Sequence, residues 1–361
     1  MAVLRHRRHL NAQTLRECIA ALEDVQKPLP LEISKLPRHR ISSRTYAETL
    51  AFLHVLWEKI LTQTSGPKKA LPKGEEYQRW LKKGGHDIHY RPVHLLHKFC
   101  MRHAPEFFQR ATVHGSIATL DDTPGFSDMD LAFIIRTSVL KDPDKLHALR
   151  AVASKILTLT YAFDPFMHHG PYYISELDLS WYPEAVFPPV LYRYGVDLLE
   201  NSKEIEIRTR PSNDITDRMF QVFEDFFIKW SAKPFALRDG FELEWVLGSA
   251  ILLPVLYYQR RTEKGHYKRN ALALAEKDFS ADEWEPIRSA TAVRAGLGRR
   301  PKPSRLLLWV AFQFQWPGLI QGWARRHPRS YRNAAVATKM LGPDYPRRTL
   351  HLLGTMRDKL K

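Results

Sequence analysis

The sequence predicts an α+β fold, and two observations carry that prediction. Apolar residues recur at helix spacing at both ends of the chain, whereas the middle holds short apolar stretches of strand type bounded by turn residues. With 361 residues, of which 44% are hydrophobic, the chain is long enough for two or three domains with sizeable cores. We therefore expect a small mixed β-sheet core, flanked by a helical N-terminal region and a C-terminal helical bundle.

The N-terminal region, residues 1–90, is expected to be helical. Residues 11–25 have helix-spaced apolar positions, and a stronger helix is expected from a Ser42 or Ser43 cap to about residue 60. A short helix at 75–81 should stop at Gly84 and Gly85. Whether this region folds as a separate domain stays open.

The central region, residues 91–200, begins with a helix at 93–103 and is then expected to contain a sheet. The predicted strands cover 107–114, 128–135 and 172–182, with a helix at 143–159 between the last two and another helix at 194–199. Alternate strand residues share a face, so Asp128 and Asp130 point the same way, roughly 7 Å apart. Met129, Leu131, Phe133 and Ile135 should take the other face. Glu176 and Asp178 would likewise share one face of the third strand.

Paired carboxylates at a strand edge suggest a metal-dependent phosphate site. Two like charges side by side repel each other, and a hard divalent cation bound by oxygen ligands removes that cost. The preceding turn holds Gly115, which lets a phosphate approach the backbone, and Ser116, which offers a hydroxyl. Asp178 is the expected third carboxylate and general base, with Glu176 as its substitute. Nucleotidyl transfer needs such a set around Mg²⁺ or Mn²⁺.

These residues carry a family resemblance. Gly115-Ser116, a gap of eleven residues, and then Asp128-Met129-Asp130-Leu131 resemble the signature of the DNA polymerase β-like nucleotidyltransferase superfamily, with Leu177-Asp178-Leu179 as its later strand. Within it, the chain is similar to the small-molecule nucleotidyltransferases of the kanamycin and streptomycin type. The resemblance implies a metal-binding set of Asp128, Asp130, Asp178 and Glu176, ATP or another nucleoside triphosphate as substrate, and a helical bundle after the sheet.

The C-terminal region, residues 201–361, is expected to be helical, with a long apolar helix at 241–260 central to the bundle. Lys268 follows that helix, where the resemblance implies a basic contact to the triphosphate. A surface lysine is an equal alternative. His168 and His169 could line the cleft or lie in the core, and Arg294 could join the site or an ion pair. His94 and His97 share a helix face, but these residues and His103 are expected not to bind metal, because the nearest acidic residue is Glu106 and histidines are frequent in this basic chain.

The net charge of +16 favours an anionic partner such as nucleic acid, a nucleotide or an acidic membrane surface. Basic and aromatic residues interleave near the C-terminus, which suits RNA or a membrane surface as well as a solvated face. The two cysteines, Cys18 and Cys100, exclude a disulfide framework and fit the cytoplasm. No signal peptide and no transmembrane segment are expected.

The sequence thus predicts an enzyme that transfers a nucleoside monophosphate to a hydroxyl of a small molecule and releases pyrophosphate, and the resemblance implies AMP as the group transferred. RNA (a tRNA end) or a protein is the alternative acceptor. A non-catalytic relative that binds a nucleotide or nucleic acid is the third alternative. The acceptor, the base and the oligomeric state are not specified by the sequence.

Overall fold

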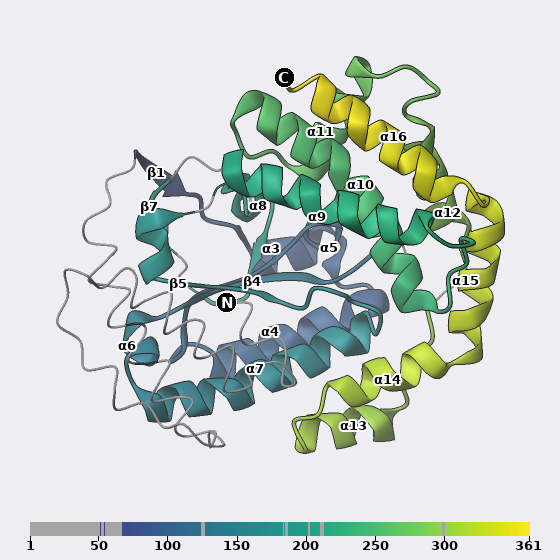
Figure 1. Cartoon of the computed structure of the whole chain (residues 1–361). Helices are drawn as coiled ribbons and strands as arrows, with labels where there is room; N and C mark the ends of the chain where they lie inside the picture. The colour runs from purple at the N-terminus through teal and green to yellow at the C-terminus, as the bar shows by residue number, and fades with distance from the viewer. Residues whose placement is uncertain are drawn as a thin grey trace, which may run out of the picture.

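The computed structural model describes residues 51, 54, 67–123, 127–182, 184, 187–200, 203–209, 213–297 and 300–361. The helices predicted at 11–25 and near 42–60 fall outside these residues, apart from Ala51 and His54. Across the described part, helices and small sheets combine into the expected α+β fold (Figure 1).

A five-stranded mixed sheet forms the centre, in the order β2-β6-β3-β4-β5. Strand β3 runs antiparallel to both β6 and β4, whereas β5 runs parallel to β4 and β2 parallel to β6. A separate antiparallel pair joins β1 to β7. The strands are β1 (Lys68–Leu71), β2 (Glu75–Glu76), β3 (Phe108–His114), β4 (Asp130–Ile135), β5 (Tyr172–Ser175), β6 (Val196–Asp197) and β7 (Ile205–Arg208).

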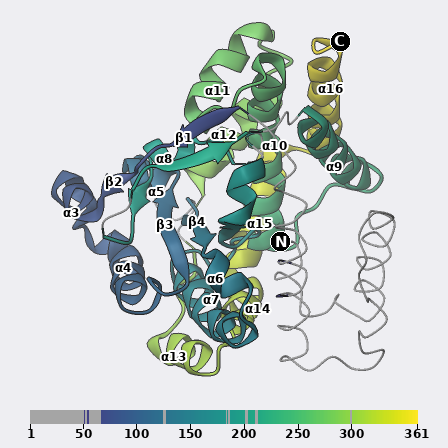
Figure 2. The same ribbon diagram turned by 90° about the vertical axis from the view of Figure 1, so that its left-hand side faces the viewer.

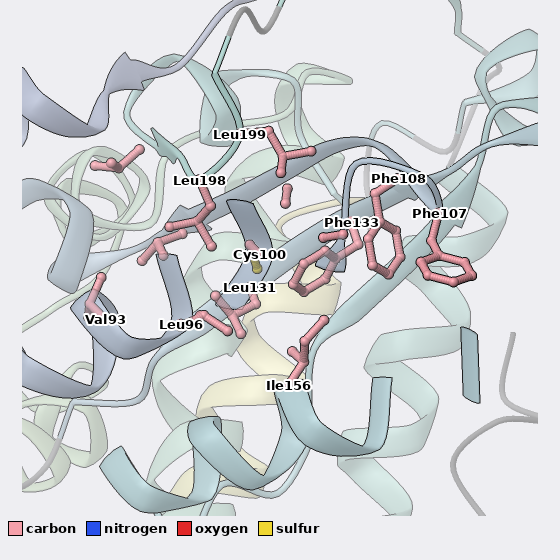
Figure 3. Close-up of a cluster of buried hydrophobic side chains, with 14 of the residues drawn as sticks. Val93, Leu96, Cys100, Phe107, Phe108, Leu131, Phe133, Ile156, Leu198 and Leu199 are labelled. Atoms are coloured by element: carbon pink, nitrogen blue, oxygen red, sulfur yellow. The ribbon is translucent and has the colours of Figure 1, made fainter. Parts of the chain in front are cut away.

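Strand β4 alternates as the sequence predicted, which decides where its first carboxylate points. Leu131 and Phe133 face a core made with helices α4 (Arg91–His103) and α7 (Pro143–Phe163), which lie side by side along one face of the sheet (Figures 1 and 2). In that core, Leu96 and Cys100 of α4 and Ile156 of α7 surround the two β4 side chains (Figure 3). Ala132 and Ile134 face a second cluster on the opposite side. Asp130, two residues before Ala132, belongs to that second face.

The C-terminal helices pack around α10 (Gly240–Thr262), whose largely apolar surface is buried on several sides. This helix is long and apolar enough to cross a bilayer by length and composition, and 78% of its most apolar window is buried in the protein. Its neighbours are α9 (Asn213–Ser231), α11 (Lys268–Ala275), α12 (Glu285–Gly296), α15 (Pro328–Leu341) and α16 (Tyr345–Asp358). Helices α13 (Arg305–Gln313) and α14 (Gly318–Arg326) extend beside α7 instead.

Short elements complete the described chain: α3 (Tyr77–Trp80), η3 (Leu81–Gly85), η4 (Ile88–Tyr90), α5 (Ser116–Thr119), α6 (Thr137–Leu140), η5 (Leu177–Trp181), α8 (Val190–Arg193) and η6 (Glu276–Asp278).

Three local predictions were wrong. Strands β1 and β2 lie in the N-terminal region that was expected to be helical, and they pair with β7 and β6. Residues 194–199, predicted as a helix, contain β6. The third predicted strand, 172–182, ends at Ser175 and continues as η5. The predicted boundaries at residues 90 and 200 stay predictions. The β1–β7 pair joins segments on either side of both, and the β2–β6 pair joins segments on either side of residue 90.

Candidate metal centre

A tight turn after β3 places Gly115 against the carboxylate of Asp130. His114 pairs with Asp130 in the β3–β4 ladder, so the next residue turns over the start of β4. Gly115 has φ 73° and ψ −158°, a conformation essentially restricted to glycine. A Cβ at this position would lie 2.6 Å from Oδ2 of Asp130. The turn and the carboxylate are therefore fitted to each other, and Ser116 follows as the first residue of α5.

The parallel pairing of β4 with β5 brings His169 to the same place. Ala132 pairs with Tyr172, so the residues just before the two strands are neighbours. His169 Nε2 lies 3.2 Å from Oδ2 of Asp128 and 3.4 Å from Oδ1 of Asp130. One ligand atom from each of these three side chains lies within 4.8 Å of the others. Asp128, Asp130 and His169 form a group that could hold a metal ion, and we call it the Asp-Asp-His group.

The hydrogen bonds of His169 orient its ring for that role. Nδ1 lies 3.0 Å from the carbonyl oxygen of Gly170, to which it donates. Nε2 then faces the two carboxylates, donating to Asp128 when it is protonated and offering a lone pair when it is not. A ring held in this way by a backbone carbonyl is typical of metal-ligating histidines.

The charges within the group are strongly coupled. Burial alone would lower the pKa of His169, but its hydrogen bond to Asp128 and the charges of Asp130 and Asp128 raise it to about 9. Burial would raise the pKa of Asp128, but the hydrogen bond and charge of His169 and the charge of Arg300 hold it well below its usual range. Burial and the charge of Asp128 raise the pKa of Asp130 to about 6. Without metal, a protonated His169 therefore neutralises part of the pair at neutral pH.

Two cationic side chains of the helical region approach the same carboxylates. Lys268 is the first residue of α11, and Arg294 lies in the last turn of α12. Burial and the charge of Arg294 lower the pKa of Lys268 to about 8, while Asp128 and Asp130 act in the opposite sense. Burial also lowers the pKa of Arg294, again against the charges of Asp128 and Asp130. The structure thus brings Lys268 to the site, and Arg294 with it.

Contacts between the segment after Gly115 and the start of α11 position Lys268 beside the site. The hydroxyls of Thr119 and Tyr267 lie 3.2 Å apart, and Arg269 forms a 3.1 Å ion pair with Asp121. Each contact joins the turn after Gly115 to a neighbour of Lys268. The position of the lysine therefore depends on packing between segments about 150 residues apart in sequence, a relationship that no local pattern predicts.

A buried ion-pair network contacts the residue that precedes Asp128. The guanidinium of Arg300 donates to the Ser127 carbonyl oxygen at 2.9 Å, to Glu244 at 2.7 Å, and lies 3.1 Å from Asp164. All three charged side chains are buried. Burial raises the pKa of both Asp164 and Glu244, against the charge of Arg300. Arg300 thereby links the residue preceding Asp128 to helix α10.

The prediction that Asp178 or Glu176 supplies the third carboxylate was wrong. Because Ser175 pairs with Ile135, both acids lie beyond the far end of β5, about 16 Å along the sheet from Asp130. Asp178 folds back to accept from the backbone N–H and the hydroxyl of Ser175, at 2.7 and 2.8 Å. Glu176 accepts from the Thr137 N–H at 2.6 Å. Their roles in the described chain are local structural ones, and His169 takes the third place.

The other histidines considered from the sequence make contacts outside the Asp-Asp-His group. His168 packs under α10, where a Cβ at Gly248 would lie 3.3 Å from its ring. Both rings pack against Tyr77, but their hydrogen-bond partners differ: His94 Nδ1 lies 2.5 Å from the Tyr77 hydroxyl, and His97 Nδ1 lies 3.2 Å from the Leu198 carbonyl oxygen. The signal for His169 was present in the sequence as a histidine just before a strand, but its role depends on the β4–β5 register.

Comparison with known proteins adds no relative to this picture. No family model matches the sequence, and no curated protein matches it. What can be argued about function therefore rests on the geometry of the site.

Proposed function

We propose that this protein is a metal-dependent nucleotidyltransferase that moves a nucleoside monophosphate from a nucleoside triphosphate to a hydroxyl group. The observation that carries the proposal is the convergence of Asp128 and Asp130 beside the Gly115 turn, with Lys268 and Arg294 near enough for the carboxylate charges to raise the pKa of both cations against the effect of burial. Acidic metal ligands next to a glycine turn and two cations suit a magnesium-bound triphosphate.

The donor set fits a hard divalent cation. Mg²⁺ is usually held by one or two carboxylates and completes its shell with phosphate oxygens and water, and Mn²⁺ also accepts an imidazole. Asp128 and Asp130 would supply the carboxylates, and His169 an optional nitrogen. When bound, such an ion neutralises phosphate charge and lowers the pKa of the attacking hydroxyl.

The protein's own groups account for the rest of the transfer. The acceptor oxygen bonds to the α-phosphorus, the bond from that phosphorus to the β-bridging oxygen breaks, and pyrophosphate leaves. Lys268 and Arg294 stabilise the charge that develops on the leaving group. The hydroxyl proton would pass to a free carboxylate oxygen of Asp130 or to water. Gly115 and Ser116 would approach the phosphates through backbone and hydroxyl.

The finer assignments follow the sequence resemblance: ATP as the triphosphate, AMP as the group moved, a small molecule as the acceptor and the cytoplasm as the location. RNA or a protein is the alternative acceptor. One observation favours a second candidate function, nucleotide binding without turnover. In it, the protonated His169 occupies the place of a cation between the carboxylates, so that a triphosphate would bind through Lys268 and Arg294 alone.

Label transfer tests the proposal. Purified protein is incubated with each α-labelled triphosphate and Mg²⁺ or Mn²⁺, alone, with total tRNA, and with a fraction of small metabolites. We expect label on an acceptor, abolished in Asp128→Asn with Asp130→Asn. Glu176→Gln is the matched control, because its amide oxygen can still accept from Thr137 and the residue lies away from the site.

The outcomes separate the candidates. Label on a metabolite supports the small-molecule acceptor, and label on tRNA supports the RNA acceptor. Metal-independent triphosphate binding without transfer supports the second candidate function. Transfer that persists in the double variant, or that disappears in Glu176→Gln, contradicts the assignment of the Asp-Asp-His group.

A further inference from the structure

Helices α13 and α14 form a hairpin whose outer surface is apolar and exposed. It lies at one end of the molecule in both ribbon views (Figures 1 and 2). Large apolar side chains of α13 and of the turn after it are more than half exposed, although side chains of this kind are usually buried. We call these four residues the apolar tip: Leu306 (70%), Trp309 (57%), Phe314 (72%) and Trp316 (56%).

Contacts with α7 and with the segment that follows it hold the hairpin in place. The hydroxyl of Ser154 in α7 donates to the Gln315 carbonyl oxygen at 2.9 Å, and Gln321 donates to the Met167 carbonyl oxygen at 3.1 Å. The ammonium of Lys155 lies 5.2 Å from the centre of the Phe312 ring. The inner side of the hairpin is packed, with Ala311, Ile320 and Ala324 buried. The exposed side chains therefore belong to a hairpin that packs on α7, which in turn packs on the central sheet.

The sequence on both sides of the tip is basic and contains no acidic residue. Residues 306–324 contain no charged residue, and residues 286–343 contain eleven Lys and Arg residues but no Asp or Glu. Four exposed cations lie on the two sides of the apolar stretch: Lys302, Arg305, Arg326 and Arg329. Arg325, directly after the stretch, is partly buried and pairs with Asp239. An apolar tip bordered by cations and free of acidic residues is complementary to an anionic interface with an apolar interior.

We propose that the α13–α14 hairpin docks the protein on an anionic membrane surface. The apolar tip would enter the boundary between headgroups and acyl chains, and the flanking cations would contact lipid phosphates. Trp309 and Trp316 suit this depth, because indole rings are favoured at membrane interfaces. Each helix has nine residues, about 14 Å long, which is too short to cross the bilayer. The hairpin would therefore lie in the interface.

Single-stranded RNA and a second copy of the chain are less well matched to this surface. RNA binding uses cations placed among the stacking rings, whereas the apolar tip contains none and includes an exposed leucine. A self-interface would bring two cationic borders together, which is unfavourable. Both are treated as outcomes of the test.

The experiment is co-sedimentation of the full chain with vesicles of phosphatidylcholine alone or mixed equally with phosphatidylglycerol. We expect binding to the mixed vesicles, with a blue shift of tryptophan fluorescence. Replacing the apolar tip by serine at all four positions should weaken binding by at least about tenfold. The milder variant Leu306→Ser with Phe314→Ser should weaken it partly. Ile88→Ser with Val222→Ser is the matched control, because these exposed apolar residues (80% and 63%) lie elsewhere.

The charge component is tested separately with glutamine at the four flanking cations. This variant should lose the preference for anionic vesicles, and added salt should reproduce the loss. Binding that is equal for tip variants and control overturns the proposal. So does a tip that is needed for binding a labelled single-stranded RNA but not vesicles. A dimer that is dispersed by the tip variants, with no vesicle binding in the parent protein, overturns it as well. Circular dichroism of each variant verifies that the fold is retained.

Discussion

Gly115 and Asp130 are packed so closely that a single methyl group cannot be inserted between them. The Cβ of any other residue at 115 would lie 2.6 Å from the carboxylate oxygen Oδ2 of Asp130. Because Asp130 is the first residue of β4 and Gly115 ends the turn from β3, this contact joins the two parts of the sequence motif.

Gly115→Ala should therefore damage the metal site as well as the backbone. The residue sits at φ 73° and ψ −158°, so alanine should cost about 1–3 kcal/mol of unfolding free energy. It should also displace Asp130 and abolish stabilisation by Mn²⁺ in thermal unfolding. Gly342→Ala is the matched control. Its backbone is similar (φ 78°, ψ 164°), but no atom of the described residues lies within 4 Å of an added Cβ. Loss of Mn²⁺ stabilisation in both variants would contradict the contact's role.

Metal binding should release a proton from His169. Its folded-state pKa, about 9, lies above the usual 6.5, so its charge stabilises the metal-free protein fully below about pH 6.5. That stability is lost as pH rises through 9. A metal ligated by Nε2 must displace the proton, so affinity for Mn²⁺ should rise across the same interval. Calorimetry in buffers of different ionisation enthalpy should show about one proton released at pH 7.

His169→Gln provides the control for that titration. The variant lacks the ionisable ring, so proton release should disappear and the pH dependence of Mn²⁺ affinity between pH 6.5 and 9 should flatten. Equal proton release in the variant and the parent would show that another group is displaced.

Lys268→Met should raise the KM for the triphosphate by about 10- to 100-fold, since the lysine would contact the leaving phosphates. The neighbouring Arg269→Met is the matched control: its side chain is 77% exposed and pairs with Asp121. Steady-state kinetics with ATP would distinguish the two. Equal effects of both substitutions would indicate that α11 acts only through its packing against α5.

Arg300→Met should destabilise the fold by about 3–5 kcal/mol, because it leaves Asp164 and Glu244 buried without their cation. Adding Asp164→Asn and Glu244→Gln should restore part of that loss. Arg347→Met, which breaks an exposed pair with Asp344, should cost no more than about 1 kcal/mol. Denaturant unfolding of the parent protein and the three variants gives the free energies to compare. No recovery in the triple variant would indicate that Arg300 acts chiefly through the Ser127 carbonyl oxygen.

The part of the site formed by residues close together in the chain could be predicted from the sequence. Gly115, Asp128 and Asp130 lie on one hairpin, so alternation along β4 and the glycine turn predicted their proximity, and the packing of Leu131 and Phe133 confirmed the strand face. The α+β class was predicted for the same reason, since periodicity is a local property.

The third ligand could not be found in this way, because it depends on where β5 stops. An apolar-acidic alternation predicted a strand through Asp178, but Asp178 accepts from Ser175 and closes the chain into η5. The spacing of Ser175 and Asp178 is compatible with such a turn and was interpreted as a strand face. The parallel register then places His169, at the other end of β5, beside the carboxylates.

The most direct test of the account is the position of bond cleavage in the triphosphate. Protein is incubated with metal and the acceptor fraction that supports turnover, using ATP labelled at either the α- or the γ-phosphate. Nucleotidyl transfer predicts that the α-label moves to the acceptor and the γ-label appears in pyrophosphate, and that both changes are lost in Asp128→Asn with Asp130→Asn. A γ-label on the acceptor or in free phosphate, with the α-label left in ADP, would contradict it.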